Sequence, residues 1–451
     1  MTHDLSRQRG AVAIMVALAM LVLLALAGLV IDSGLAYLVK ARLNAAVDSA
    51  ALAAARAVPA GNNQTEQADS ARAAARQFFA ANIPASYLLS TPQLLSIDVA
   101  FDAGEVKIDV TAEAPMKLSF MQVLGFASIT PRAHAQTVRK DLDMALVVDT
   151  SGSLKDVDNQ VKASTKSFLN KFNVTQDRVA LIHFGSGAQV DQPIATSARG
   201  FRRDAMLSQV SNYVFGGGTS SVEGMWHARE QLKSVPATNR SSLRVIVFFS
   251  DGAPTSFGTY LSIDKSSCKT AGALDYTATG LYNLNISANQ HLPDCKLPEK
   301  PWDVAKKLPA WYNAHNPATN QNDPARRELP IVTTSANPTP RLVTDDIGNS
   351  TAFKRNVDRA ARNLAEAVAT KAREEGIYVF TLGMGASLKT KSGVDAETGE
   401  SVLKCMANVA DGPARCYNPA KPVGMYCYAA TDADLTPCFS KLASAILRIA
   451  K

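Results

Sequence analysis

No cysteine occurs before position 268 in this chain of 451 residues. The six cysteines form no C-x-x-C pair, which argues against zinc-ribbon and thioredoxin-like motifs. An even number of well-separated cysteines fits disulfide bonds instead, and these need an oxidising compartment. Six cysteines allow about 15 pairings, and their spacing does not choose among them. They are Cys268, Cys295, Cys405, Cys416, Cys427 and Cys438.

Charged residues are also scarce. They make up 19% of the chain, against 47% hydrophobic residues, which is typical of a folded protein. The formal net charge is only +7, and no run of five or more Lys and Arg is present, so we expect no nucleic-acid binding. A chain of 451 residues exceeds one ordinary core, which predicts two or three structural units.

Common catalytic motifs are missing as well. The sequence has no G-x-x-x-x-G-K-[ST] phosphate loop, no H-E-x-x-H and no G-x-S-x-G elbow. Asp141 and Asp143 have the spacing of an Asp-x-Asp phosphatase motif, but they precede a predicted strand, whereas that motif ends one. His183 and His227 stand isolated in the sequence, and we expect both to be structural. The chain is therefore predicted not to be an enzyme.

Between residues 10 and 31 the sequence is uncharged, free of proline and strongly apolar. A helix of about 20 residues crosses the hydrocarbon layer of a membrane, whereas the apolar core of a cleaved signal peptide has only about 7–15 residues. Arg7 and Arg9 precede the segment, and Lys40 and Arg42 are the first bases after it. The positive-inside tendency then predicts a cytoplasmic N-terminus. We expect a retained single-pass anchor with the bulk of the chain outside the cytoplasm.

The helix is predicted to continue to about residue 57, because Ala- and Leu-rich sequence runs without a breaker until Pro59. Its second half would be a plain stalk or a surface for packing against another helix. A small α+β module is expected at residues 58–140, with a hairpin turn at Ala103–Gly104. Its predicted elements are a helix at 65–82, strands at 96–102 and 105–114, a short helix at 116–126 and a strand at 130–140.

The string RQRGAVAIMVALAMLVLLALAGLVIDSGLAYLVKARLNAAVDSAALAAARA resembles the N-terminus of the TadE/TadG-like proteins of Flp (Tad) pilus assembly systems. In the pilin-like members of that family, glutamate stands at the fifth position after a glycine, for prepilin peptidase processing. Here Gly10 is followed by AVAIM, which places Met15 at that position. The resemblance therefore implies an anchored TadG-like protein of the bacterial inner membrane, with a periplasmic or extracytoplasmic bulk, rather than a processed pseudopilin.

From residue 141 onward, strands and helices alternate, which predicts a doubly wound, mostly parallel sheet covered on both faces. The predicted strands cover residues 143–149, 178–185, 243–251 and 376–385. The predicted helices cover residues 157–172, 201–213, 222–232, 352–375 and 439–449. The expected fold is thus α/β, after a transmembrane helix and a small α+β module.

Two of these strands end in an aspartate followed by turn residues. One ends in VVDTSGS, with Asp149, Ser151 and Ser153, and another ends in SDG, with Asp251. Open α/β sheets bind ligands at the carboxyl ends of their strands, and a glycine-rich turn could bring the hydroxyl of Thr219 there. Hard cations such as Mg²⁺ take oxygen ligands and use one or two carboxylates. The pattern predicts a metal site; helix capping by Asp-x-Ser-x-Ser is the alternative.

These five residues resemble the metal-ion-dependent adhesion site (MIDAS) of von Willebrand factor A domains. The Asp-x-Ser-x-Ser motif of that family falls on Asp149, Ser151 and Ser153. Its loop threonine falls on Thr219 and its later aspartate on Asp251. The resemblance implies such a domain at residues 141–451, with bound Mg²⁺, Mn²⁺ or Ca²⁺. It also implies that an acidic side chain of a protein partner completes the coordination of the metal, without chemistry on that partner.

A stretch rich in Asn, Pro and Thr, at about residues 254–350, interrupts the alternation. Such a long loop is uncommon in a compact domain unless it is functional or folded. It leaves from the turn that carries Asp251, so we expect it to flank or cover the metal; a floppy surface insertion is the alternative. Cys268 and Cys295 could close part of it. We favour pairing of the four later cysteines among themselves. The resemblance implies that the segment around the last two forms the last strand and helix, so we expect the bridges to be local staples.

The combined prediction is a membrane-anchored Tad pilus assembly component that binds envelope or pilus-assembly proteins through its metal site. A surface adhesin that binds a host or matrix ligand directly is the alternative. A metal-dependent hydrolase is less favoured. The identity of the partner and of the metal is left open.

Overall fold

The computed structural model describes residues 8–58, 64–102, 105–261, 271–277, 281–284, 302, 305–317, 319–337 and 339–449. The chain divides into two compact units, one up to Lys140 and one from Asp141 to Ala450, and each is described by itself. The predicted link between Cys268 and Cys295 lies outside the described residues.

The first unit is built on one long helix, α1 (Gln8–Ala57). Its first half is exposed: only 6% of the most apolar 18-residue window is buried, and the mean hydropathy there is 3.1. By length and composition this helix can cross a membrane. In its second half Val39, Leu43 and Val47 are fully buried. This half is therefore not a plain stalk but the centre of a core.

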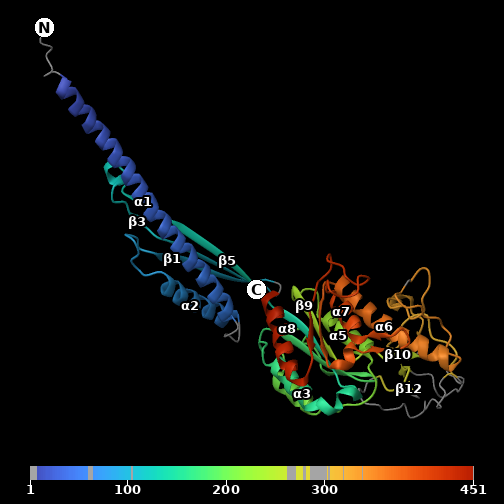
Figure 1. The fold of residues 1–451 in the computed structure, drawn as a ribbon. Helices are drawn as coiled ribbons and strands as arrows, with labels where there is room; N and C mark the ends of the chain where they lie inside the picture. The colour runs from blue at the N-terminus through green and yellow to red at the C-terminus, as the bar shows by residue number, and fades with distance from the viewer. Residues whose placement is uncertain are drawn as a thin grey trace, which may run out of the picture. The chain divides into compact units, whose positions relative to one another are not determined.

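The core of the first unit lies between α1, helix α2 and a three-stranded antiparallel sheet. Figure 1 shows the strands running alongside α1. The sheet has the order β1-β2-β5, and Asp102 pairs with Glu105 across the predicted hairpin, whose two turn residues are outside the described part. The elements are α2 (Gln64–Asn82), β1 (Gln93–Asp102), β2 (Glu105–Glu113) and β5 (Arg132–Lys140).

The predicted short helix at residues 116–126 is largely wrong. β3 (Met116–Lys117) pairs with β4 (Ser128–Ile129), and only the 3-10 turn η2 (Met121–Leu124) lies between them. Strand pairing satisfies the backbone at both ends of the segment, which leaves room for one helical turn.

Asp32 of α1 holds this segment in place. Its buried carboxylate accepts the backbone N–H groups of Ser119 at 3.1 Å, Phe120 at 2.9 Å and Met121 at 2.8 Å. An ionised acceptor makes stronger hydrogen bonds than a neutral one. The segment before η2 is therefore fastened to α1 at the point where the exposed apolar stretch ends.

The second unit contains a six-stranded sheet in the order β16-β13-β9-β6-β7-β8. All neighbouring strands are parallel except β7 and β8. The doubly wound, mostly parallel sheet that the sequence predicts is thus confirmed. The strands are β6 (Leu142–Asp149), β7 (Arg178–Phe184), β8 (Ala188–Gln192), β9 (Leu243–Ser250), β13 (Tyr378–Met384) and β16 (Tyr426–Ala429).

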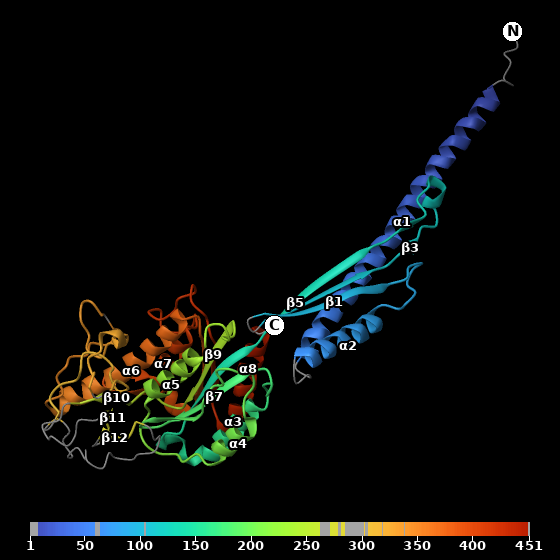
Figure 2. The same cartoon turned by 180° about the vertical axis from the view of Figure 1, so that it is seen from behind.

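Helices cover both faces of this sheet, as Figures 1 and 2 show. On one face α5, α6 and α7 enclose a core that includes Ala145 and Val147 of β6. On the other face α3, α4 and α8 enclose a second core with Leu146 and Val148. The helices are α3 (Asp158–Leu169), α4 (Arg203–Ser211), α5 (Ser221–Ser234), α6 (Ser350–Glu374), α7 (Gly399–Ala407) and α8 (Leu435–Ile449). Shorter elements are η3 (Gly152–Val157), η5 (Pro324–Arg326), η6 (Ala386–Lys389), η7 (Asp432–Asp434), β14 (Lys391–Ser392) and β15 (Glu397–Thr398).

The described part of the insertion is folded. Its first residues form an antiparallel sheet of β10 (Ser256–Tyr260), β11 (Ala271–Asp275) and β12 (Leu281–Tyr282). Beyond residue 305 it has almost no regular structure, yet residues such as Tyr312 and Ile331 are buried in the core that α5 and α6 share. For these residues, the alternative of a floppy surface insertion is wrong.

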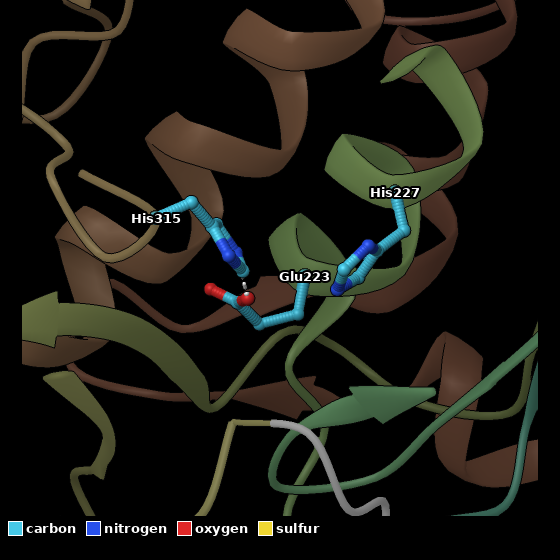
Figure 3. Close-up of side chains that lie close together, drawn as sticks. All are labelled: Glu223, His227 and His315. Atoms are coloured by element: carbon cyan, nitrogen blue, oxygen red, sulfur yellow. Dashed lines mark hydrogen bonds and ion pairs between the residues drawn. The ribbon is translucent and has the colours of Figure 1, made fainter. Parts of the chain in front are cut away.

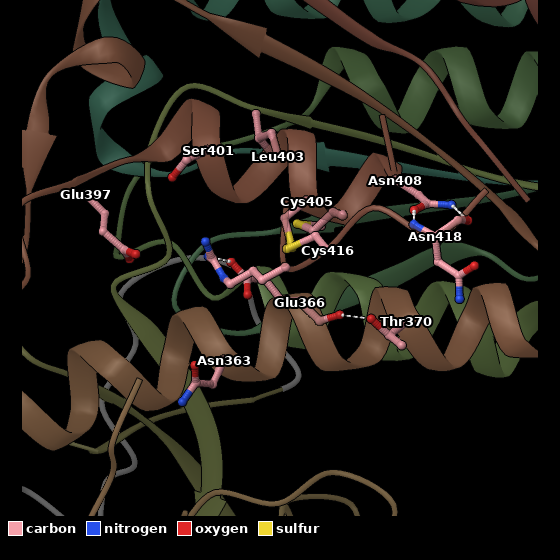
Figure 4. The surroundings of a disulfide bond; sticks show 12 residues. Asn363, Glu366, Thr370, Glu397, Ser401, Leu403, Cys405, Asn408, Cys416 and Asn418 are labelled. Carbon is pink, nitrogen blue, oxygen red and sulfur yellow. Dashed lines mark hydrogen bonds and ion pairs between the residues drawn. A yellow bond between two sulfur atoms is a disulfide. The ribbon is translucent and has the colours of Figure 1, made fainter. Parts of the chain in front are cut away.

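Two disulfide bonds, Cys405–Cys416 and Cys427–Cys438, join the four later cysteines. Each spans 11 positions of sequence, so both are the local staples that we expected. The first ties α7 to the loop after it, close to Glu366 of α6 (Figure 4). The second ties β16 to the first turn of α8.

Candidate metal centre

The candidate centre lies at the carboxyl edge of two adjacent strands. β6 ends at Asp149 and its parallel neighbour β9 ends at Ser250, directly before Asp251. Because parallel strands end at the same edge of a sheet, the two aspartates are brought to one place, as the sequence predicts.

Hydrogen bonds connect the carboxylates through hydroxyl groups. Ser250 donates its hydroxyl to Asp149 Oδ2 at 2.6 Å, and the Ser151 N–H donates to Asp149 Oδ1 at 2.7 Å. The Ser153 hydroxyl donates to Asp251 Oδ1 at 2.9 Å and lies 3.2 Å from the Ser151 hydroxyl. Four of the five predicted ligands therefore form one connected group.

The loop that carries Thr219 packs against the VVDTSGS turn. The Gly216 N–H donates to the Thr150 carbonyl at 2.8 Å, and the Gly152 N–H donates to the Gly217 carbonyl at 3.1 Å. A Cβ placed on Gly252 would lie 3.9 Å from the hydroxyl oxygen of Thr219. The fifth predicted ligand thus lies next to the turn that follows Asp251.

The two aspartates are buried without a cationic partner. Asp149 is 0% exposed and Asp251 is 6% exposed, and within the described residues neither forms an ion pair with a basic side chain. Burial, followed by the negative charge of Asp251, raises the pKa of Asp149 to about 7, although hydrogen bonds from Ser151 and Ser250 oppose the shift. Burial also raises the pKa of Asp251.

This set of donors fits a hard divalent cation. Two carboxylates and three hydroxyls provide only oxygen ligands, and a cation among them would balance the buried negative charge. Helix capping does not account for the arrangement, because neither Ser151 nor Ser220 makes a side-chain capping bond to the helix that follows it.

Ser250 was missed at the sequence level. It lies directly before Asp251 and is fully buried, and its hydroxyl makes the shortest hydrogen bond to Asp149. A serine as the last residue of an otherwise apolar strand was the available signal.

The insertion touches the Thr219 loop from its other side. Thr255 accepts the Thr219 N–H at 3.0 Å on its hydroxyl, and Asp275 of β11 accepts the Thr255 hydroxyl at 3.3 Å. A Cβ on Gly218 would collide with the Asp275 carboxylate. The insertion therefore flanks this loop, while the expectation that it covers the metal stays a prediction.

Asp141 and Asp143 lie at the opposite end of the sheet, at and just before the start of β6. Asp143 accepts hydrogen bonds from Ser241 and is paired with Arg178 and Arg199. This buried charge cluster is separate from the candidate centre, and the Asp143 carboxylate is satisfied by these partners.

His183 and His227, which the sequence analysis singled out, both have defined neighbours. His183 is bonded to Asp191 at 2.8 Å and stacks near Tyr213, which is a structural role. The prediction that His227 stands isolated is wrong, because it lies with Glu223 and His315 in one cluster. His315 belongs to the insertion, so sequence distance concealed the contact.

Comparison with known proteins agrees with the fold of the two units. Residues 143–278 match the von Willebrand factor type A domain, and residues 10–57 match the Flp pilus-assembly TadE/G-like family. The chain combines a TadE/G-like N-terminus with a von Willebrand factor A domain. All five predicted metal ligands lie within the matched part of this A domain. No curated protein matches the chain significantly.

Solved structures of pilus proteins are similar to this chain at low sequence identity. The pilus adhesin SpaC from Lactobacillus rhamnosus GG is 15% identical with a TM-score of 0.39, over 79% of this chain but only 34% of the adhesin. The PilB minor pilin from Streptococcus sanguinis is 13% identical with a TM-score of 0.36, over 81% of this chain and 80% of the pilin. The vWF domain of the type V pili tip protein Mfa5 from Porphyromonas gingivalis is 16% identical with a TM-score of 0.37, over 70% of this chain and 98% of that domain. Likenesses at this level do not define a ligand or a partner.

Proposed function

We propose that this protein is a membrane-anchored component of Tad pilus assembly that binds another envelope protein through a divalent cation. The cation, Mg²⁺ or a similar ion, is held by five residues of the A domain: Asp149, Ser151, Ser153, Thr219 and Asp251. The observation that carries the proposal is the buried pair of aspartates, which no basic side chain neutralises within the described residues. When bound, the cation supplies a coordination position that an acidic side chain of the partner can complete.

The surroundings of the site support binding rather than catalysis. Asp149 is held between the Ser250 hydroxyl and the Ser151 N–H, so it is positioned as a ligand, and no histidine or lysine of the described residues is bonded to it. The TadE/G-like match and the exposed apolar half of α1 support a location in the inner membrane. Arg7 and Arg9, just before the apolar stretch, favour an N-terminus in the cytoplasm and an A domain outside it.

The test is co-purification of the tagged full chain, in detergent, with envelope proteins of its own bacterium, in Mg²⁺ or in EDTA. Asp149→Asn keeps the shape of the side chain but removes the charge. Asp156→Asn is the matched control, since Asp156 is an exposed acid in the same turn. We expect a pilus or envelope protein, identified by mass spectrometry, to bind the wild type and Asp156→Asn in Mg²⁺ only. Equal capture by Asp149→Asn, or in EDTA, would contradict the proposal.

Cell fractionation separates this function from that of a surface adhesin. Recovery of the full chain with the inner membrane agrees with an assembly component. Recovery on the outer surface, free of the inner membrane, would favour direct adhesion to a host or matrix ligand.

A further inference from the structure

A second group of potential metal ligands lies on helix α5, away from the five residues above. Glu223 and His227 are one helical turn apart and face the same side. His315, from the insertion, reaches the same place, and the ligand atoms of the three side chains all lie within 4.8 Å of one another. Figure 3 shows the three side chains converging.

Glu223 is fixed on one of its two oxygens. Its Oε1 accepts the Tyr312 hydroxyl at 2.6 Å and the Gly258 N–H at 3.0 Å. Its Oε2 lies 2.7 Å from Nε2 of His315. The carboxylate is fully buried, and its orientation is set by two contacts from the insertion. Supporting hydrogen bonds of this kind orient metal ligands in proteins.

The two imidazoles are oriented as well. The His315 ring stacks on Trp226, with ring centroids 3.7 Å apart and an angle of 9° between the planes. The His227 ring lies edge-on to both Trp226 and His315, with centroids 5.1 Å from each. Aromatic contacts thus fix both rings before any ligand binds.

One ring nitrogen of His227 has no hydrogen-bond partner to account for its burial. Its Nε2 atom is buried and has no hydrogen-bond partner among the described residues. Buried polar atoms are nearly always satisfied, so an orphaned ring nitrogen that faces a carboxylate and a second histidine indicates a missing ligand. A neutral imidazole offers the lone pair of one ring nitrogen to a metal ion.

We propose that Glu223, His227 and His315 bind a zinc-class metal ion that fastens the insertion to helix α5. Two imidazole nitrogens and one carboxylate oxygen are a known zinc ligand set, whereas Mg²⁺ and Ca²⁺ prefer oxygen ligands alone. Metal binding replaces the hydrogen bond between His315 Nε2 and Glu223 Oε2: its proton passes to solvent or to Nδ1 of His315, and the two atoms move slightly apart to admit the ion.

A cavity of about 260 Å³ adjoins the group on one side. His315 lines it together with Trp226 and Tyr312, whereas Glu223 and His227 do not. Since α5 begins directly after the Thr219 loop, the ion would also stabilise the helix that carries this loop into the A-domain core.

The test is Co²⁺ binding by the full chain in detergent, purified with a histidine-free tag. Excess Mg²⁺ is present throughout to occupy the oxygen-rich centre. We expect equimolar Co²⁺ uptake with visible absorption of a low-coordinate ion. His227→Phe keeps the ring packing but removes one ligand, and should weaken binding at least about 100-fold. Asp149→Asn and His134→Gln, which removes an exposed histidine of the first unit, should bind Co²⁺ like the wild type.

The outcomes are distinct. Uptake by His227→Phe equal to that of the wild type, or no uptake by the wild type at micromolar Co²⁺, overturns the inference. Loss in Asp149→Asn would also overturn it, because the ion would then belong to the other centre. Metal-free His227→Phe should melt no lower than the wild type, since the buried Nε2 atom that it removes has no hydrogen-bond partner among the described residues. Should it fail to fold, Tyr312→Phe keeps all three ligands and is expected to weaken Co²⁺ binding by about tenfold.

Discussion

Several acidic side chains of the A domain are buried around the Thr219 loop. Asp149 and Asp251 lie on one side of the loop, and Asp275 of the insertion lies on the other. Burial raises the pKa of each of these carboxyls. A raised pKa means that the folded state prefers the neutral acid, so each ionised carboxylate reduces stability until something offsets its charge.

Asp275 provides a test, because it is not one of the proposed ligands. The pKa of Asp275 is higher in the folded than in the unfolded state. The ionised carboxylate therefore lowers the free energy of unfolding: this loss is absent below the unfolded pKa and appears as pH rises through the folded pKa. Asp275→Asn keeps an acceptor for the Thr277 N–H and hydroxyl. In thermal unfolding of the full chain in EDTA, this variant should melt above the wild type at about pH 7.5, and the gain should shrink towards about pH 4.5. A gain of equal size at both pH values would show that charge is not its cause.

The proposed ligands of the A domain were predictable because each lies next to a recognisable strand end or turn. Two important residues were not. Ser250 ends an apolar strand, and its position there does not reveal that its hydroxyl bonds to Asp149 on the neighbouring strand. His315 contacts Glu223 only because an insertion without sequence periodicity folds back onto α5.

The conformation of the loop before Thr219 depends on its glycines. Gly217 has a φ of +86°, a left-handed backbone conformation that residues other than glycine adopt only with strain. At Gly218 an added Cβ would collide with the Asp275 carboxylate, whereas at Gly216 nothing lies within 4 Å of it. A side chain is therefore expected to be unfavourable at Gly217 and Gly218 but tolerated at Gly216.

A comparison of Gly218→Ala with Gly216→Ala tests whether this loop is held in its position from both sides. Gly218→Ala should lower the free energy of unfolding by about 1–3 kcal/mol, since the Asp275 side chain must move. It should also reduce the thermal stabilisation that Mg²⁺ gives. Gly216→Ala should stay within about 0.5 kcal/mol of the wild type, with an unchanged Mg²⁺ response. Equal losses in the two variants, measured by denaturant unfolding, would exclude the collision as the cause.

Sequence patterns located the central strands closely, because each is a continuous apolar run buried on both faces. They did not locate β8, α7 or the β10–β12 sheet. β8 is five residues of mostly polar sequence, AQVDQ, at the edge of the sheet. α7 follows a short hairpin and begins at a Thr398 cap that only tertiary structure reveals. The insertion is stabilised by burial against α5 and α6 rather than by local periodicity.

For the molecule as a whole, α1 has two environments. Its first half is exposed and apolar, and its second half is buried in the first unit from Val39 onward. The two halves therefore have separable roles, attachment in one and folding in the other.

Removal of residues 1–31 should release the chain from membranes without unfolding the first unit, because Asp32 and the buried half of α1 are retained. Sedimentation of membranes after an alkaline wash measures the release. Asp32→Ala is the matched control: it should stay with the membrane but expose the backbone N–H groups of Ser119, Phe120 and Met121 to faster hydrogen exchange. A truncated chain that still sediments with membranes would point to another attachment.

α1 continues without interruption from its exposed half into the core, and Asp32 fastens the segment before η2 to it where the two halves meet. Kinks in long helices arise at proline, at glycine–serine pairs or at bulges. This helix contains no proline and is α-helical from Gln8 to Ala57, but the pair Ser33–Gly34 directly follows Asp32. The pair is therefore the position at which a pull on the first unit would bend the helix most easily. In the proposed anchored arrangement, tension from a growing pilus would reach the bilayer through this position, as bending there or as tilting of the apolar half.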